Sequence, residues 1–360
     1  MAFDRLYHTL IELVGIPSTT GHEEQVRAYI EQRVAHLGLS TQVDTIGNLI
    51  ATLEGNGQPL LLNAHMDRVP PGLGHTPVVR NGVLYSDGNT NLGADDAAGI
   101  AIILETLTRI VEEKLPHPPL VVVFTVQEEA GLCGATTFDA SNWQVTDGIV
   151  FDNAFEAGAV VSQGAAYEAF DIRITGHTGH PGKDLSQTVN AIEIFRATNY
   201  PHGSLANDRT RILFSRVTGG NARNAIPASL FIEGELRSFE TPEVRARYLQ
   251  EIRTVFEETA HAHGGQVEMT TNPHSTGYAL DENEPLLATY RDVLAQRGET
   301  LQLRPTFIGS DTSGFRPAVR AFTLSTGVVN EHSIEEYVPL APLEQVVKDT
   351  LQVLRTWSEQ

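Results

Sequence analysis

The spacing of apolar residues in the first third of the chain alternates between the period of a helix and that of a strand. Apolar side chains recur three and four residues apart between Val26 and Leu37 and again over 97–113, which predicts two amphipathic helices. Short apolar runs bounded by turn residues predict strands at 48–53, 60–64, 120–126 and 148–151. Helices that alternate with strands buried on both faces are typical of a mostly parallel sheet flanked by helices, an α/β fold.

The pattern changes between residues 166 and 275. The predicted strands there are 167–175, 211–218, 230–239 and 266–271, and the predicted helices are 189–197 and 242–261. This order is typical of the split β-α-β unit, an α+β fold with four antiparallel strands backed by two helices. A helix at 285–296, a strand at 321–325 and a helix at 343–357 follow. We therefore predict one α/β domain, 1–165 with 276–360, interrupted by a smaller domain at 166–275.

Composition and charge exclude several classes of protein. A chain of 360 residues that is 41% hydrophobic and 19% charged is neither disordered nor a coiled coil. Its formal net charge of -20 disfavours nucleic-acid binding, which begins with a basic field around the phosphates. No apolar run approaches the roughly 20 residues that cross a bilayer. Cys133 is the only cysteine, which excludes an internal disulfide and a Cys-x-x-Cys zinc site. These features predict a soluble cytoplasmic protein without a membrane partner.

Acidic and histidine residues stand where the predicted strands end. His65 and Asp67 follow one strand and, being two residues apart, leave the same face of it. An aspartate in that place can accept the second ring N–H of a metal-bound histidine. Glu128 and Glu129 follow a second strand, and Asp152 follows a third. The carboxyl ends of parallel strands are the edge at which open α/β sheets bind ligands.

Two further segments add candidates to this edge. Asp95 and Asp96 precede a predicted helix, and one aspartate is enough to cap it, so the other has a second task. His332 lies in a loop beyond the last predicted strand. Taken singly, each of these residues is also compatible with a solvated turn. Together they offer nitrogen and oxygen ligands without thiolate, which suits zinc, with cobalt or manganese as alternatives.

The motifs around these residues resemble the co-catalytic zinc peptidase and amidohydrolase family that includes peptidase T, carboxypeptidase G, aminoacylase and succinyl-diaminopimelate desuccinylase. They span nearly the whole chain in the family's order: Asn63-Ala-His65-Met-Asp67, Leu92-Gly-Ala-Asp95-Asp96-Ala-Ala-Gly99, Gln127-Glu128-Glu129-Ala-Gly131, Val150-Phe-Asp152, Gly176-His-Thr-Gly-His180-Pro-Gly182 and Val329-Asn-Glu-His332-Ser333. The sequences around Asp95 and Asp152 look most like peptidase T. The interrupted architecture is similar as well.

The resemblance implies a role for each matching residue. The implied ligands of one divalent ion are His65, Asp95 and Asp152, and those of a second ion are Asp95, Glu129 and His332. Asp67 would orient His65, and Glu128 would act as the general base. The peptide bond between Asp95 and Asp96 is expected to be cis. The chain departs from the family at Ala97, where relatives often have lysine.

The resemblance also implies the groups that bind substrate. In relatives, the histidine that corresponds to His180 reaches the active site of the partner subunit, so a homodimer through the small domain is implied. Asn224 and Arg237 match positions that hold a substrate carbonyl or carboxylate. A guanidinium suits a carboxylate, although Arg237 alone could equally form a surface salt bridge. Gly309 and Ser310 resemble the family's late Gly-Ser-Asp loop, which lines the pocket.

Three functions are compatible with these motifs. The first is a metal-dependent exopeptidase that cleaves short peptides, similar to the tripeptide aminopeptidase peptidase T. The second is a carboxypeptidase or N-acyl-amino-acid deacylase with the same metal chemistry. The third is an inactive binding or scaffold protein, which is disfavoured because all five ligand positions and Glu128 are present. The sequence contains neither a Gly-x-Ser-x-Gly nucleophile elbow nor a phosphate-binding Gly-Lys-Ser/Thr, which argues against other enzyme classes.

Overall fold

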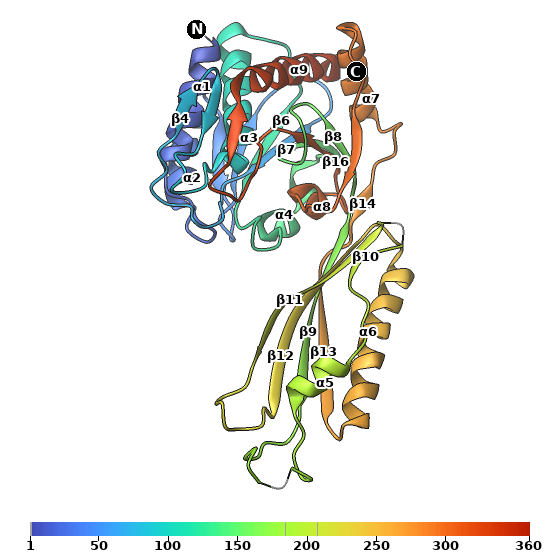
Figure 1. The fold of residues 1–360 in the computed structure, drawn as a ribbon. Coiled ribbons are helices and arrows are strands. Elements are labelled where there is room, and N and C mark those ends of the chain that lie inside the picture. Colours follow the sequence, from blue (N-terminus) through green and yellow to red (C-terminus); the bar gives the residue numbers. More distant parts are fainter. Residues whose placement is uncertain (1, 184, 207) are drawn as a thin grey trace. The chain divides into compact units, whose positions relative to one another are not determined.

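The computed structural model describes residues 2–183, 185–206 and 208–360 (Figure 1). The chain forms two compact units, unit 1 from Met1–Gly164 with Tyr278–Gln360 and unit 2 from Ala165–Gly277. Each unit has hydrophobic core residues of its own. Within the described ranges, no helix is both long enough and apolar enough to cross a membrane.

Parallel strands form the centre of the sheet in unit 1. In sheet order they are β6 (Leu120–Thr125), β3 (Leu60–His65), β7 (Asp147–Asp152) and β16 (Arg320–Ser325). On the β6 side, antiparallel pairing adds β2 (Leu49–Leu53) and β1 (Ser40–Val43). On the β16 side lie β8 (Val160–Gly164), β14 (Tyr278–Ala279) and β15 (Leu303–Thr306). β3, β6 and β7 are buried along their whole length, which explains their continuous apolar runs.

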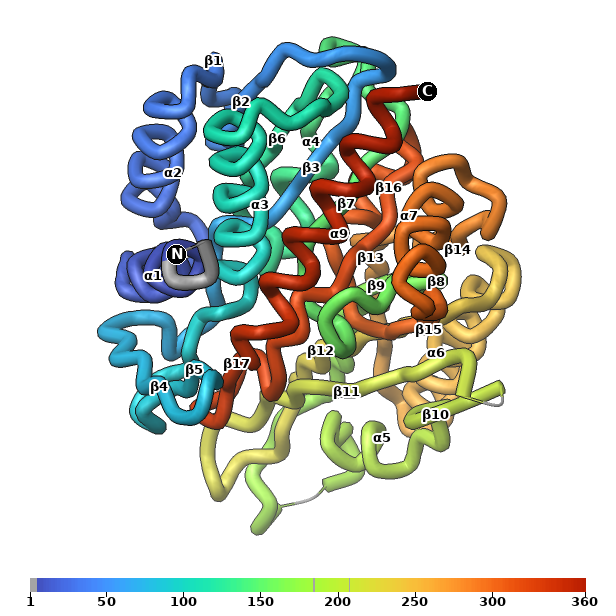
Figure 2. Tube along the Cα trace, turned by 90° about the horizontal axis from the view of Figure 1, so that it is seen from above, coloured from blue at the N-terminus to red at the C-terminus, as the bar shows by residue number. Residues whose placement is uncertain are grey.

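Helices cover both faces of this sheet, as Figures 1 and 2 show. One face packs against α1 (Ala2–Gly15), α2 (Glu24–His36), α3 (Ala94–Glu113), α7 (Pro285–Gln296) and α9 (Leu340–Ser358). The other packs against α4 (Cys133–Thr137), a 3-10 helix at Ala140–Trp143 and α8 (Asp311–Phe315). Successive residues of β3 divide between the two faces: Leu60 and Leu62 belong to the first core and Leu61 to the second.

A small separate sheet in unit 1 joins two segments that carry candidate ligands. It consists of β4 (Val78–Arg80), β5 (Val83–Tyr85) and β17 (Tyr337–Pro339), paired antiparallel. β5 precedes Asp95 in the chain and β17 follows His332. The pairing of β5 with β17 therefore connects the chain segments that lead to these two residues.

Unit 2 is an antiparallel sheet with two helices packed on one face (Figure 1). Its strands, in sheet order, are β10 (Gly203–Leu205), β11 (Thr210–Gly219), β12 (Ser229–Ser238), β9 (Ala166–Thr175) and β13 (Gln266–Ser275). The helices are α5 (Ala191–Ala197) and α6 (Pro242–Ala262). The expected β-α-β-β-α-β order is present, and the short edge strand β10 extends the expected set.

A buried ionic network joins three helices of unit 1. Glu105 on α3 is 3% exposed and accepts hydrogen bonds from Arg5 of α1 at 2.7 Å and from Arg109 at 2.6 Å. Arg109 also binds Glu344 of α9 at 2.7 Å. Removing Glu105 would leave two guanidinium groups without the carboxylate between them.

We expect Glu105→Ala to lower the free energy of unfolding by about 1.5–3 kcal/mol, the usual contribution of hydrogen bonds to charged groups, because Arg5 keeps Glu112 and Arg109 keeps Glu344 as partners. Urea unfolding followed by circular dichroism measures this loss. Glu112→Ala is the matched control, because Glu112 also binds Arg5 but its side chain is 56% exposed. The control should lose at most about 1 kcal/mol. Equal losses in the two variants would contradict the importance of burial.

Candidate metal centre

The carboxyl ends of adjacent strands bring the candidate ligands of unit 1 to one edge of its sheet. His65 is the last residue of β3 and Asp152 the last of β7, and these strands are parallel neighbours. Glu129 follows the carboxyl end of β6, the neighbour of β3 on its other side. Asp95 comes from the first turn of α3, and His332 from the loop before β17. The structure thus gathers all five predicted ligands.

The two oxygens of Asp95 face two different histidines. Asp95 Oδ1 lies 3.5 Å from His65 Nε2, which is also 3.9 Å from Asp152 Oδ1. Asp95 Oδ2 lies 3.3 Å from His332 Nε2, which is 2.8 Å from Glu129 Oε1. Two groups of ligand atoms result, each within 4.8 Å: His65 with Asp95 and Asp152, and His332 with Asp95 and Glu129. Asp95 is the member that both groups share.

The donors in this cluster fit a pair of divalent cations. His65, Asp152 and Asp95 are 3%, 5% and 9% exposed. Asp95 Oδ1 is buried and accepts no hydrogen bond from the described residues. A buried carboxylate oxygen without a partner is costly, and a bound cation would remove that cost. The nitrogen and carboxylate donors are those that zinc, cobalt and manganese accept.

The electrostatics of the site also favour cations. Burial, together with the negative charge of neighbouring carboxylates, raises the pKa of Glu128 and of Asp152 well above their ordinary values. Burial opposes ionisation of Asp95 as well, but the neighbouring imidazole groups of His332 and His65 lower its pKa. So many acids in one buried place repel one another, and positive ions relieve that repulsion.

Asp67 organises the turn that carries the two glutamates. It is fully buried, and its carboxylate accepts the backbone N–H of Glu128 at 2.9 Å and that of Glu129 at 3.2 Å. Thr20 donates its hydroxyl to the same carboxylate at 2.9 Å. The ring of His65 is held differently, because its Nδ1 lies 2.9 Å from the backbone carbonyl of Asp67 and 3.5 Å from the carboxylate. Asp67 therefore fixes both the histidine and the glutamate turn.

The adjacent aspartates at the start of α3 have different tasks. Asp96 accepts the backbone N–H of Gly99 at 2.9 Å, as a helix cap, and the N–H of His65 at 3.3 Å. A Cβ at Gly99 would lie 2.4 Å from Asp96 Oδ1, so this cap requires glycine there. Asp95 is left to face the histidines. The peptide bond between the two aspartates is cis, as expected.

Two buried acids at the site were missed by the sequence analysis. Asp311 is 1% exposed and accepts the hydroxyl of Thr125, at the end of β6; burial raises its pKa to about 6. In the sequence, Asp311 is marked by the Gly309-Ser310-Asp311 motif, of which only Gly309 and Ser310 were predicted to line the site. Glu336 is also 1% exposed and accepts backbone N–H groups at the start of α3. No sequence pattern distinguishes a loop glutamate that binds the backbone of a distant helix from one that is exposed to solvent.

The predicted substrate-binding residues are divided between the two units. In unit 1, Gly309 is exposed, whereas Ser310 is 7% exposed with its hydroxyl 2.8 Å from that of Thr323. In unit 2, His180 and Asn224 are exposed loop residues. Arg237, on β12, forms an ion pair with Glu235 at 3.0 Å, and its guanidinium lies 4.7 Å from the ring centroid of Tyr167. Their roles in binding substrate stay predictions.

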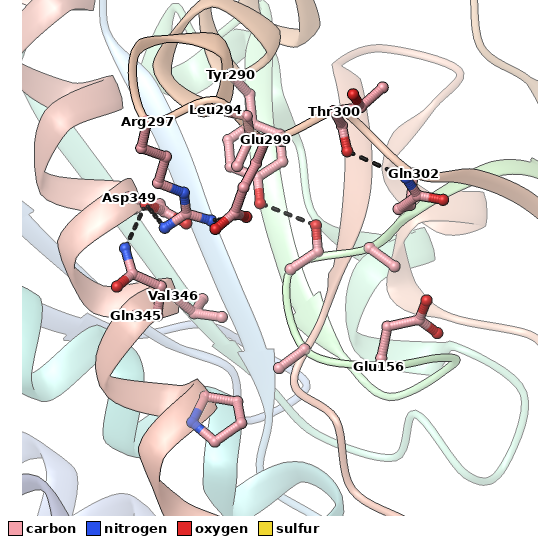
Figure 3. A pocket seen from close by; sticks show the side chains of 14 residues that line it. Glu156, Tyr290, Leu294, Arg297, Glu299, Thr300, Gln302, Gln345, Val346 and Asp349 are labelled. Carbon is pink, nitrogen blue, oxygen red and sulfur yellow. Dashed lines mark hydrogen bonds and ion pairs between the residues drawn. The ribbon is translucent and has the colours of Figure 1, made fainter.

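Unit 1 also contains a cavity of about 340 Å³ lined by residues of α7, α9 and the loop after β7 (Figure 3). Several of its polar groups are paired with one another. Arg297 binds Asp349 at 2.7 Å and Glu299 at 2.6 Å, and Tyr290 donates its hydroxyl to the carbonyl of Gly158 at 2.8 Å. The lining residues differ from the candidate metal ligands.

Comparison with known proteins places the chain in a family. Residues 61–356 match Peptidase family M20/M25/M40, and the chain belongs to this family. It is 29% identical to the uncharacterized protein YqjE of Bacillus subtilis, over 97% of this chain and 96% of that protein. It is 26% identical to peptidase T of Serratia proteamaculans, over 77% of this chain and 68% of that protein.

Two solved structures are similar over nearly their whole length. A tripeptidase from Staphylococcus aureus has a TM-score of 0.94 at 28% identity, and the match covers 99% of both chains. The aminopeptidase PepT from Bacillus cereus has a TM-score of 0.89 at 26% identity, again over 99% of both. The predicted family and two-part fold are confirmed, and the protein is a hydrolase that acts on peptides.

Proposed function

We propose that the protein is a two-metal exopeptidase that releases the amino-terminal residue from tripeptides. The observation that carries the proposal is the carboxylate of Asp95, which directs one oxygen toward His65 and the other toward His332. That geometry suits a ligand shared by two cations. The similarity to a tripeptidase and to PepT, each over 99% of this chain, supports tripeptides as the substrate class.

His65, Asp95 and Asp152 would hold one divalent ion, and Asp95, Glu129 and His332 the other. Zinc suits this ligand set best, with cobalt and manganese as alternatives. When bound, two such ions supply Lewis acidity that activates water and polarises the scissile carbonyl. The side chain of His332 is 46% exposed, so solvent reaches the cluster from the His332 side.

Glu128 is the proton carrier in this proposal. Its carboxylate is 9% exposed and lies beside His65 and Glu129, with which it forms a third group of possible ligands. It takes a proton from the attacking water and passes it to the leaving amine. Asp67 holds the backbone of Glu128, so the carboxylate is presented from a fixed turn.

A substrate panel tests the proposed specificity. We expect release of the amino-terminal residue from tripeptides. Acetylation of the substrate amine should lower the rate about 100-fold or more, because an exopeptidase that recognises the amine then loses a buried contact with a charged group. Mass spectrometry of the products identifies the end that is cut, and the Glu128→Gln protein serves as the blank. Faster cleavage of N-acyl amino acids would favour a deacylase, and release of the carboxyl-terminal residue would favour a carboxypeptidase.

We also propose that the protein acts as a homodimer, with His180, Asn224 and Arg237 contacting substrate. The exposed positions of His180 and Asn224 and the motifs that carry all three support this assignment. Sedimentation equilibrium measures the oligomeric state, and a monomer with full activity would contradict the dimer. A single cysteine suits the reducing cytoplasm, which stays the predicted location.

A further inference from the structure

Glu336 binds the backbone at the start of α3 through both carboxylate oxygens. Its Oε2 accepts the N–H groups of Leu92 at 2.8 Å and Gly93 at 2.9 Å. Its Oε1 accepts those of Ala94 at 2.8 Å and Asp95 at 3.2 Å. The first N–H groups of a helix have no partner inside the helix, and here one carboxylate satisfies consecutive donors across that end.

The segment that Glu336 holds has an irregular backbone. Gly93 has φ +71°, in the left-handed region, and Asp95 and Asp96 have dihedral angles outside the helical range although they belong to α3. A helix does not impose such a conformation, so contacts must select it. The N–H of Asp95 is itself one of the four donors, which places the Glu336 contact on the residue that both ligand groups share.

The main chain of Glu336 connects the same region to the loop of His332. Its N–H donates to the carbonyl of Ser333 at 3.2 Å, and its carbonyl accepts the N–H of Ser86 at 3.0 Å. The next residue, Tyr337, exchanges two backbone hydrogen bonds with Val329, at 2.8 and 3.0 Å. The loop that carries His332 is therefore closed at its base, directly beside the residue that holds Asp95.

Arg68 provides positive charge on the buried side of this segment. It is 1% exposed, and its guanidinium donates to the carbonyls of Leu13, Val14 and Ile16. A Cβ at Gly93 would lie 2.7 Å from Arg68 Cδ, which shows how closely the loop passes over this side chain. The guanidinium of Arg68 attracts the carboxylate of Glu336, so Glu336 has electrostatic support as well as hydrogen bonds.

We propose that Glu336 is a positioning residue that holds the Asp95 carboxylate between the two ion positions and keeps the loop of His332 in place beside it. The inference rests on the proposed metal centre and extends it beyond the ligands. Glu336 has no place among the ligand groups and acts through the backbone of Asp95. Its loss should weaken the binding of both ions, because Asp95 belongs to both groups.

Glu336→Gln tests this role. The substitution keeps the volume, but its amide nitrogen is a donor and meets two N–H groups where an oxygen accepted them. Cobalt(II) is added to metal-free protein and followed by calorimetry and by visible absorption, so that affinity and ligand geometry are read apart from activity. We expect about 10- to 100-fold weaker binding of cobalt and an altered absorption spectrum.

Glu105→Gln is the matched control, because Glu105 is also a buried glutamate of unit 1 and lies on α3, but its carboxylate binds Arg5 and Arg109 instead of the backbone at the start of the helix. It should lose stability and keep the cobalt affinity and spectrum of the unaltered protein. Wild-type affinity and spectrum in Glu336→Gln would overturn the inference, as would equal loss of affinity in both variants.

If Glu336→Gln does not fold, Glu336→Asp takes its place. This variant keeps the charge, but its side chain is too short to reach all four donors. Wild-type cobalt binding by Glu336→Asp would equally overturn the inference. Failure of the unaltered protein to bind cobalt would instead refute the proposed function.

Discussion

Replacement of Glu128 by glutamine is expected to lower the rate of tripeptide hydrolysis about 100- to 10,000-fold, the usual contribution of a positioned general acid–base group. The amide has the shape of the carboxylate but cannot take a proton from water. Asp67 still holds the backbone of residue 128, so the turn and the neighbouring Glu129 should keep their places. The variant is therefore expected to retain its metal ions and its stability.

Steady-state kinetics on a tripeptide, with metal content measured on the same sample, check this expectation. Glu129→Gln is the informative comparison, because Glu129 is a proposed ligand and its loss should lower metal content together with rate. A Glu128→Gln protein with normal turnover would remove Glu128 from the mechanism. A variant that loses rate and metal together would make Glu128 a ligand instead of the base.

Replacement of Asp95 by asparagine is expected to weaken the binding of both ions by at least about 100-fold each, because even residues that only support metal ligands contribute about 10- to 100-fold. Asp95 is the shared member of the two ligand groups, and its two oxygens serve different histidines. Replacement of His332 by alanine should weaken the binding of one ion, while His65, Asp95 and Asp152 still hold the other.

Metal analysis after gel filtration distinguishes these variants, with about zero ions expected for Asp95→Asn and about one for His332→Ala. Asp147→Asn is the control, because Asp147 is a buried aspartate at the other end of β7, where it binds Arg320 at 2.7 Å and joins neither ligand group. It should keep both ions. Retention of two ions by Asp95→Asn would show that the carboxylate is not shared.

Most elements with a strong apolar period were predicted from the sequence, α1 (Ala2–Gly15) being the exception, and those too short for a period were missed. The helix expected at 285–296 is α7 at those residues, and the buried runs at 60–64 and 120–126 are β3 and β6. The short strands β4, β5 and β14 have two or three residues, too few for a period. The spacing of Leu6, Leu10 and Leu13 would have predicted α1, which buries all three.

The ligand positions were predictable because strand ends of a parallel sheet share an edge, and the supporting acids were not. His65 and Asp152 follow apolar runs whose burial is visible in the sequence. The partners of Glu336 are backbone N–H groups, and that of Asp311 is the Thr125 hydroxyl. Those partners come from chain segments more than 180 residues away, so the apolar pattern distinguishes neither acid from a solvated one, and Asp311 is marked only by its place in the Gly309-Ser310-Asp311 motif.

Anomalous diffraction from crystals of the protein grown with zinc tests the central claim most directly. The account predicts two peaks at the zinc edge, one bounded by His65, Asp95 and Asp152 and the other by Asp95, Glu129 and His332. Asp95 should lie against both peaks. A single peak, or zinc bound at residues other than these, would contradict a paired centre built around one shared carboxylate.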